Sequence, residues 1–276
     1  MMYDTDFNID EWKAKKQAER QAAFAAQEEA MQAVFESGQT LTDYFYGRGR
    51  LGSHITAGNA AVILKTLPLA KAVMTGDEWS KYGRRANKGS EGILQIARNN
   101  GYYTAIKVFD VSQTYGNKPY PIAVLETKEQ KEKAINVLAE ICPIPAVMPP
   151  DCHEVVYSAE KDEITLPTTR PPEEVLQWLP AQIVLAVAEH SYEGISENPY
   201  MRQTAAAVAV EVCGRLGLPA PPDAAEMLVG MKEHIPDGEE RRALEKVREL
   251  AVTFGDTVCQ RLKLERGQPT PQREER

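Results

Sequence analysis

The sequence has little of what metal catalysis, disulfide bonding and membrane insertion require. Its four cysteines are scattered and form no CxxC pair, and its four histidines are spread over the chain. In a chain this long, such cysteines are typical of reduced thiols in a cytoplasmic protein. No apolar run approaches the roughly 20 residues that span a bilayer, and the acidic, polar start MMYDTDFNIDEW is unlike a signal peptide. We expect a soluble, cytoplasmic protein without membrane contact.

An overall excess of positive charge is also missing. The formal net charge of −8 argues against a protein coated in basic surface. The charge is unevenly distributed, however, because residues 43–118 hold 11 Lys and Arg against 5 Asp and Glu, a net of +6 that leaves −14 for the remainder. Nine of the 20 aromatic residues also fall in this window. The sequence therefore predicts one basic, aromatic part and one acidic part.

Hydrophobic periodicity predicts the α+β class, with helices dominant in the second half. The Asn-Gly within RNNGYY (residues 98–103) lies between extended segments and predicts a β-hairpin. A second, small hairpin is expected at 154–158 and 163–166, and GRGRLGS (47–53) is expected to be a glycine-rich basic loop. Helices are expected at 10–37, where Gly38 should end the helix, and at 42–46, 59–67, 127–140, 173–192, 200–216, 224–235 and 239–264.

These elements suggest four consecutive parts. Residues 1–39 form an N-terminal helix whose sparse apolar positions suggest that its first half projects into solvent or docks on a partner. Residues 40–126 form a small mixed module, and residues 127–264 form a mostly helical domain. Residues 265–276, a polar segment with two prolines, are expected to be disordered.

The stretch DEWSKYGRRANKGSEGILQI (77–96) places a Trp and a Tyr among four cations. Either it grips a nucleic-acid strand or it is a solvated hairpin. Cations follow the phosphate backbone, and aromatic faces stack on bases at about 1–3 kcal/mol each. The candidate contact residues are Arg48, Arg50, Trp79, Tyr82, Arg84, Arg85, Lys88, Tyr102 and Lys107. Trp79 and Phe109 also fit a hydrophobic core, and at most one of the neighbours Tyr102 and Tyr103 points inward, because successive strand residues face opposite sides.

The order of motifs between residues 59 and 116 resembles the N-terminal domain of ArdC-like antirestriction proteins, which conjugative plasmids and related mobile elements carry. The matching positions are Asn59, Pro68, Trp79, Gly83-Arg84-Arg85, Lys88-Gly89, Ile93–Ile96, Val108-Phe109-Asp110 and Gln113-Thr114. The resemblance implies that this module binds single-stranded DNA and helps to protect incoming DNA from host defence.

Complete ArdC-like proteins also carry a domain that resembles zinc metallopeptidases. Its HExxH motif places two histidines on one helix face, and its glutamate positions a water. Here VVYSAEKDEITLP and TAAAVAVEVCGRLGL resemble the segments on either side of that motif. The aligned positions are Ala186, Val187 and His190, with the third ligand at Thr204 or Ala206. We therefore expect a zincin-like domain without its metal site: no catalytic residue, no metal and no cofactor.

The resulting prediction is a single-stranded-DNA-binding antirestriction accessory protein of a mobile element, which acts by binding and is not an enzyme. One alternative is that the acidic part and the first helix bind a host defence nuclease and inhibit it. Another is an active zinc metallopeptidase, which the missing HExxH motif disfavours. Loss of partner capture on deletion of residues 1–37 would favour the first alternative, and about one zinc per chain would favour the second.

Overall fold

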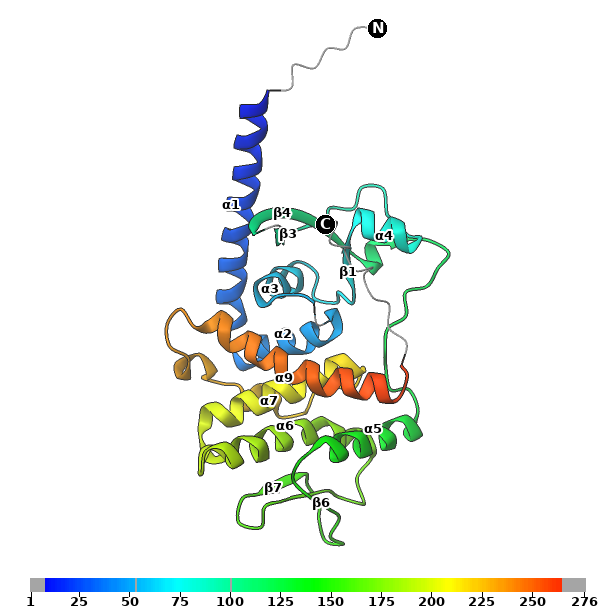
Figure 1. Ribbon diagram of the computed structural model, residues 1–276, viewed down its shortest axis with the longest axis vertical. Coiled ribbons are helices and arrows are strands. Elements are labelled where there is room, and N and C mark those ends of the chain that lie inside the picture. The colour runs from blue at the N-terminus through cyan, green and yellow to red at the C-terminus, as the bar shows by residue number, and fades with distance from the viewer. Residues whose placement is uncertain (1–7, 53, 100, 265–276) are drawn as a thin grey trace.

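The computed structural model describes residues 8–52, 54–99 and 101–264. It is a mixed α+β structure, as predicted, in which a body of packed helices separates two regions of short strands (Figure 1). The helices are α1 Ile9–Val34, α2 Gly38–Leu51, α3 Ala57–Thr66, α4 Gly76–Tyr82, α5 Lys128–Ile141, α6 Pro172–Ser191, α7 Pro199–Leu216, α8 Ala224–Met227 and α9 Glu240–Arg261. Short 3-10 helices cover Val111–Gln113, Ile195–Glu197 and Met231–His234.

The strands form three small sheets. Their bounds are β1 Val73–Thr75, β2 Arg85–Ala86, β3 Ile93–Asn99, β4 Tyr102–Asp110, β5 Thr114–Tyr115, β6 Ala146–Val147, β7 Val156–Ser158 and β8 Glu163–Thr165. The sheet orders are β1-β4-β3, β2-β5 and β6-β8-β7. All strand pairs are antiparallel except β6 with β8, which is parallel.

Both predicted hairpins are present. Strands β3 and β4 pair with Asn99 opposite Tyr102, so the loop between them is two residues long. Gly101 has a φ of +83°, the left-handed conformation that such a turn favours at glycine. Residue 100, the Asn of the predicted Asn-Gly turn, lies outside the described residues. Strands β7 and β8 form the second hairpin.

The predicted glycine-rich loop at 47–53 is wrong for residues 47–51, which continue helix α2. Residue 53 lies outside the described part. The glycines allow close packing, because a Cβ at Gly49 would lie only 2.0 Å from the Glu211 carbonyl oxygen on α7. A Cβ at Gly214 of α7 would likewise lie 2.1 Å from the Tyr46 carbonyl oxygen. Two helix backbones can approach this closely only where the side chain is absent.

Helix boundaries differ from the prediction in three further places. Helix α1 ends at Val34, and Gly38, which was expected to end it, instead begins α2, because Ser37 forms a capping box with Thr40. Helix α1 begins at Ile9, where the prediction had residue 10, and Asn8 caps it by accepting from the backbone N–H groups of Asp10 and Glu11. The helix expected at 224–235 is divided into α8 and the 3-10 helix Met231–His234, because Gly230 takes a φ of +72° between them.

One hydrophobic core runs through most of the chain. It includes residues of α1, α2 and α3 as well as residues of α5, α6, α7 and α9. Helix α2, which the sequence assigned to the 40–126 module, packs against α7 in the helical body. A smaller cluster around Ala72, Met74 and Trp79 lies between α4 and the β1-β4-β3 sheet. The predicted boundary at 126/127 therefore does not separate two independent cores.

No helix within the described ranges is long and apolar enough to cross a membrane. The tail at 265–276, predicted to be disordered, lies outside the described residues.

Candidate nucleic-acid interface

We call the matching positions between residues 59 and 116 the ordered motif, because it is their order along the chain that matches. Several of these residues hold the module together and do not form its binding surface. Asn59 on α3 reaches β3, the edge strand of its sheet. Its Nδ2 donates to the Ile96 carbonyl at 2.8 Å, and its Oδ1 accepts from the Ile96 N–H at 3.1 Å and from Gln27 Nε2 at 2.6 Å. A buried edge strand needs partners for its outward backbone groups. Asn59 supplies them and ties α1, α3 and the sheet together.

Asp110 and Gln113 likewise bind backbone groups, at the point where β4 ends. Asp110 Oδ1 accepts from the backbone N–H groups of Lys71 and Ala72 at 2.8 and 2.9 Å. Gln113 accepts from the Asp110 N–H and donates to the Glu91 carbonyl. The acid of the Val-Phe-Asp motif thus accepts hydrogen bonds from backbone N–H groups. These hydrogen bonds also satisfy the buried carboxylate itself.

Trp79 and Arg84 were predicted to contact a strand; the structure corrects Trp79 and shows that Arg84 also has partners within the fold. Trp79 is fully buried, and its Nε1 donates to the Phe109 carbonyl at 2.8 Å. Each of the three guanidinium nitrogens of Arg84 donates a hydrogen bond within the module. Its Nε donates to Thr114 Oγ1 at 2.9 Å, Nη2 donates to the Thr114 carbonyl at 2.9 Å, and Nη1 donates to the Lys118 carbonyl at 2.8 Å. Trp79 offers no face to a base, and Arg84 ties α4 to β5.

Arg48 is a further correction, because only 1% of its surface is exposed. It donates to the Tyr44 hydroxyl and the Leu244 carbonyl, and it forms ion pairs with Glu245 at 3.2 Å and Glu211 at 3.8 Å. Burial raises the pKa of Glu211 to about 7, although the positive charge of Arg48 opposes the shift. Arg48 neutralises acids between α2, α7 and α9 and cannot reach a ligand.

Arg50 is half-buried at the end of α2. Its Nη2 donates to the Pro68 carbonyl at 2.7 Å, and its guanidinium lies 5.3 Å from the centroid of the Tyr46 ring. Both cations of the expected basic loop therefore have partners inside the fold.

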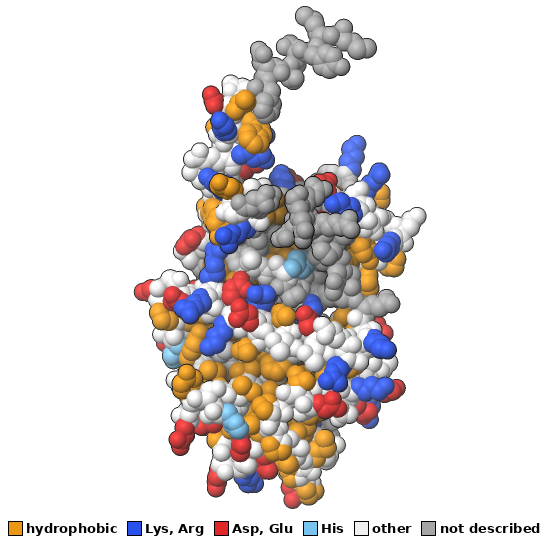
Figure 2. Space-filling model, in the orientation of Figure 1, with side chains coloured by type: hydrophobic (Ala, Val, Ile, Leu, Met, Phe, Trp, Pro, Cys, Tyr) orange, Lys and Arg blue, Asp and Glu red, His pale blue; other side chains and the backbone are white. Residues whose placement is uncertain are grey.

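Four exposed cations remain around the β2-β5 pair. In the register of these strands Arg85 lies opposite Tyr115, which is 56% exposed. Lys118 places its Nζ 4.3 Å from the centroid of the half-buried Tyr82 ring, whose hydroxyl donates to the Pro119 carbonyl. We call Lys81, Tyr82, Arg85, Lys88, Tyr115 and Lys118 the basic ribbon. Blue side chains gather over this part of the molecule at the upper right of Figure 2.

The charges of the basic ribbon are not neutralised by neighbours. Within residues 8–52, 54–99 and 101–264, none of Lys81, Arg85, Lys88 and Lys118 forms an ion pair. Lys81, Tyr115 and Lys118 were not among the sequence candidates. Strand pairing places Tyr115 opposite Arg85, which lies thirty positions earlier in the sequence, so only the fold brings the two together.

Tyr102 and Lys107 lie apart from the basic ribbon. Tyr102 is 76% exposed and Tyr103 is 50% exposed at the tip of the β3-β4 hairpin, so neither enters the core. Lys107 is exposed midway along β4. From Tyr102 to the ribbon end of β4 there are eight residue steps, or about 26 Å at the usual rise of a strand. Of the sequence candidates, Tyr82, Arg85 and Lys88 therefore lie in the basic ribbon, Tyr102 lies at the hairpin tip, and Lys107 lies between them on β4.

The positions aligned with a zinc site lie on α6 and α7, next to the β6-β8-β7 sheet. Ala186 and Ala206 are buried and offer no ligand atom, and the hydroxyl of Thr204 donates to the Tyr200 carbonyl. His190 Nε2 lies 2.7 Å from Asp162 Oδ1, while Glu189 accepts from two backbone N–H groups of the following turn. In the described part of the chain no group of three or more His, Cys, Asp or Glu side chains is placed to hold a metal ion. These residues do not fit a zinc ion.

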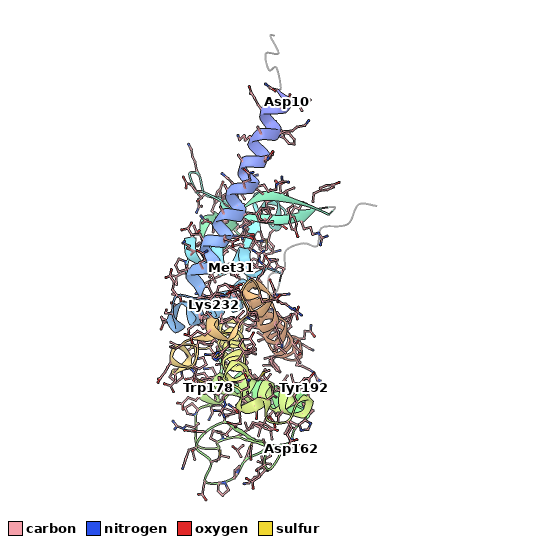
Figure 3. All side chains as sticks on the ribbon, turned by 90° about the vertical axis from the view of Figure 1, so that its left-hand side faces the viewer. Asp10, Met31, Asp162, Trp178, Tyr192 and Lys232 are labelled. Carbon is pink, nitrogen blue, oxygen red and sulfur yellow. The ribbon has the colours of Figure 1, made fainter. Side chains whose placement is uncertain are left out.

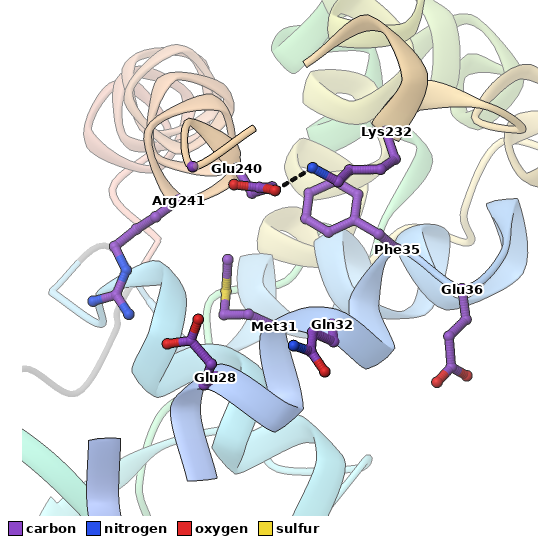
Figure 4. A pocket seen from close by; sticks show the side chains of 9 residues that line it. Glu28, Met31, Gln32, Phe35, Glu36, Lys232, Glu240 and Arg241 are labelled. Carbon is purple, nitrogen blue, oxygen red and sulfur yellow. Dashed lines mark hydrogen bonds and ion pairs between the residues drawn. The ribbon is translucent and has the colours of Figure 1, made fainter. Parts of the chain in front are cut away.

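A hollow of about 560 Å³ lies between α1 and the start of α9 (Figure 4). Its apolar floor includes Met31 and Phe35. Its charged lining carries both signs, because Glu28, Glu36 and Glu240 stand beside Lys232 and Arg241. Lys232 already pairs with Glu240. A lining with more acids than cations does not suit phosphate, so this hollow is not the nucleic-acid site.

Two solved structures similar to this chain are crystal structures of the antirestriction ArdC protein from the R388 plasmid. The metal-free structure is 13% identical, covers 76% of this chain and 86% of that chain, and has a TM-score of 0.45. The Mn(II)-bound structure is 15% identical, covers 81% and 96%, and has a TM-score of 0.47. They belong to the family that the motifs of residues 59–116 resemble. No protein-family model and no curated protein matches the chain. Because the identities and TM-scores are low, we base the function on this chain's own residues.

Proposed function

We propose that this protein binds single-stranded DNA through the basic ribbon and acts by binding rather than by catalysis. The observation that carries the proposal is the proximity of exposed cations to aromatic rings: Arg85 lies opposite the exposed Tyr115, and Lys118 lies over the half-buried ring of Tyr82. Cations of this kind follow the backbone of a strand while rings stack on its bases. Since no acidic side chain of the described residues pairs with these cations, their charge is available to phosphate.

A single strand suits this surface better than a duplex. An aromatic side chain stacks on a base only when the base is unstacked from its neighbours, which a continuous duplex does not allow. The net charge of −8 also limits nonspecific attraction to duplex, because only a local part of the surface is positive.

The biological role that we propose is that of an antirestriction accessory protein of a mobile element. It rests on the ordered motif of residues 59–116, whose structural members, such as Asn59 and Asp110, hold the module in shape. We propose binding rather than catalysis because buried alanines on α6 and α7, Ala186 and Ala206, stand at positions that the resemblance aligns with metal ligands.

The test is fluorescence anisotropy of a labelled single-stranded oligonucleotide, titrated at several salt concentrations beside a duplex of the same sequence. We expect the wild type to prefer the single strand. The double substitution Arg85→Ala with Lys88→Ala should weaken binding and lower the salt slope by about 1.4, because each single-strand phosphate contact contributes about 0.7. Arg84 is left unchanged because it holds the module together.

The matched control removes two exposed lysines outside the basic ribbon, Lys128→Ala on α5 with Lys161→Ala in the β7-β8 turn, and changes the net charge equally. It should leave the slope as it is in the wild type. An equal loss of slope in both double variants would show a general charge effect and would refute the assignment of the site to the basic ribbon.

A further inference from the structure

The first half of α1 projects beyond the rest of the molecule (Figure 1). Figure 3 shows Asp10 far out on this helix and Met31 at the body. From residue 8 to residue 22 no side chain of α1 is buried, whereas Ala23, Gln27 and Ala30 pack into the fold. An exposed helix of this length gains little from burial, so its side chains are free to serve another purpose.

One face of the projecting half is basic and ends on an aromatic ring. At about 100° per residue, Lys13, Arg20 and Phe24 lie on one stripe, and Lys16 lies beside it. Lys15 points to the opposite side of the helix. Among the described residues neither Lys13 nor Arg20 forms an ion pair, while Lys16 pairs with Glu19 at 2.8 Å. We call Lys13, Lys16, Arg20 and Phe24 the α1 stripe.

The α1 stripe meets the tip of the β3-β4 hairpin. The rings of Phe24 and Tyr103 pack edge to face with their centroids 5.8 Å apart. Tyr102 is 76% exposed at the same hairpin tip, and Arg98 lies opposite Tyr103 in the strand register. The hydrogen bond from Lys16 lowers the pKa of Glu19, and the charge of Lys107 on β4 adds to the shift. Helix α1 and strand β4 are therefore electrostatic neighbours.

We infer that the α1 stripe, the hairpin tip and the basic ribbon together form one extended binding surface for a single nucleic-acid strand. The inference rests on the proposed function and adds a second arm to it. Both arms have the same chemistry, exposed cations next to exposed aromatic faces. The stripe adds about 16 Å at 1.5 Å per helical residue, which lengthens the surface from about 26 to about 40 Å.

The experiment compares a short oligothymidylate with a long one, about 8 and about 24 nucleotides, lengths chosen around the roughly 4–16 nucleotides that common modules cover. The variant is Lys13→Gln with Arg20→Gln, because glutamine keeps helix propensity. We expect a several-fold weaker binding of the long oligonucleotide, with a salt slope lower by about 1.4, and unchanged binding of the short one.

The matched control is Lys15→Gln, compared with the single variant Lys13→Gln. Both remove one lysine from the same exposed helix, but only Lys13 lies on the stripe. Far-UV circular dichroism checks that α1 remains helical. Oligouridylates resemble oligothymidylates in their phosphates and bases but contain ribose. The same series with oligouridylates therefore shows whether the α1 stripe prefers deoxyribose or ribose.

Two results would overturn the inference while leaving the proposed function intact. One is a Lys13/Arg20 variant that binds the long oligonucleotide as tightly as the wild type does. The other is a dimer, seen by light scattering, that Phe24→Ala dissociates without affecting oligonucleotide binding, which would assign the stripe to a second copy of the chain. A wild type that binds neither oligonucleotide at low salt would instead refute the proposed function and, with it, this inference.

Discussion

The same side chain has three different roles at Arg48, Arg84 and Arg85. Arg48 lies buried among acids, Arg84 donates to three oxygens within the module, and Arg85 is exposed beside Tyr115. All three occur in basic, aromatic sequence, so residue type alone predicted contact for each. Burial removes Arg48 from contact with a ligand, and Arg84 already donates from all three of its guanidinium nitrogens to oxygens of the protein, whereas Arg85 is exposed.

Glu211, the buried partner of Arg48, leads to a prediction about pH. Its folded-state pKa of about 7 lies above the ordinary 4.5, so between these values the native state keeps a proton that the unfolded chain has lost. Stability from this group is therefore present below about pH 4.5 and falls as the pH rises toward 7. In Glu211→Gln this loss should disappear, and the free energy of unfolding of the variant should rise relative to the wild type across that window.

The measurement is chemical denaturation of both proteins at several pH values. The quantity compared is the difference in unfolding free energy between them, because other titrating groups cancel to first order in that difference. A difference that stays constant from pH 4.5 to 7 would contradict the raised pKa of Glu211.

At the scale of elements, the hairpin signal depended on residues within the loop itself, whereas the role of the glycines at 47 and 49 depended on elements elsewhere in the sequence. The β3-β4 hairpin was correctly predicted because a two-residue loop depends on the loop residues themselves, among them Gly101 with its φ of +83°. The glycines at 47 and 49 gave the wrong prediction because their function is a contact with Leu64 and with α7, which is remote in sequence. Glycine in a helix and glycine in a loop look alike until the partner element is known.

Arg84 gives a prediction for the β2-β5 pair. Arg84→Ala removes three hydrogen bonds that tie α4 and β2 to β5 and to the segment after it. We expect it to destabilise the protein by about 1–3 kcal/mol, since it leaves partly buried acceptors without a donor. Arg85→Ala, at an exposed neighbouring position, should change stability by no more than about 0.5 kcal/mol. Urea denaturation measures both, and equal losses would contradict the division of roles between the two arginines.

At the scale of the whole molecule, the module and the helical body share one core. Helix α2 packs on α7 at Gly49 and Gly214, and the Leu125 N–H donates to the Leu216 carbonyl where the chain passes into the second part. The two parts should therefore unfold together. The chain has three tryptophans, and Trp178 lies on α6 in the helical body. In a variant carrying Trp12→Phe and Trp178→Phe, tryptophan fluorescence reports Trp79 of the module, and far-UV circular dichroism reports mainly the helical body. We expect these two signals to give one coincident transition.

Gly49→Ala is the matching variant, because its Cβ would collide with the α7 backbone. It should lower the midpoint of both signals together, since α2 belongs to both parts. Separate transitions, with only one of them shifted, would show instead that the boundary at 126/127 divides two independently folding domains.

The sequence alone determined the α+β class, the long first helix, the hairpin turn and the charged, aromatic character of residues 43–118, because these depend on composition and on local periodicity. It also supplied the ordered motif, since that is a property of the chain. The tertiary structure decided which members of that set are available to a ligand. It buried Arg48 and Trp79, engaged Arg84, and brought Tyr115 to Arg85 and Phe24 to Tyr103. Burial and pairing between distant residues are set by how the elements pack, which no local pattern records.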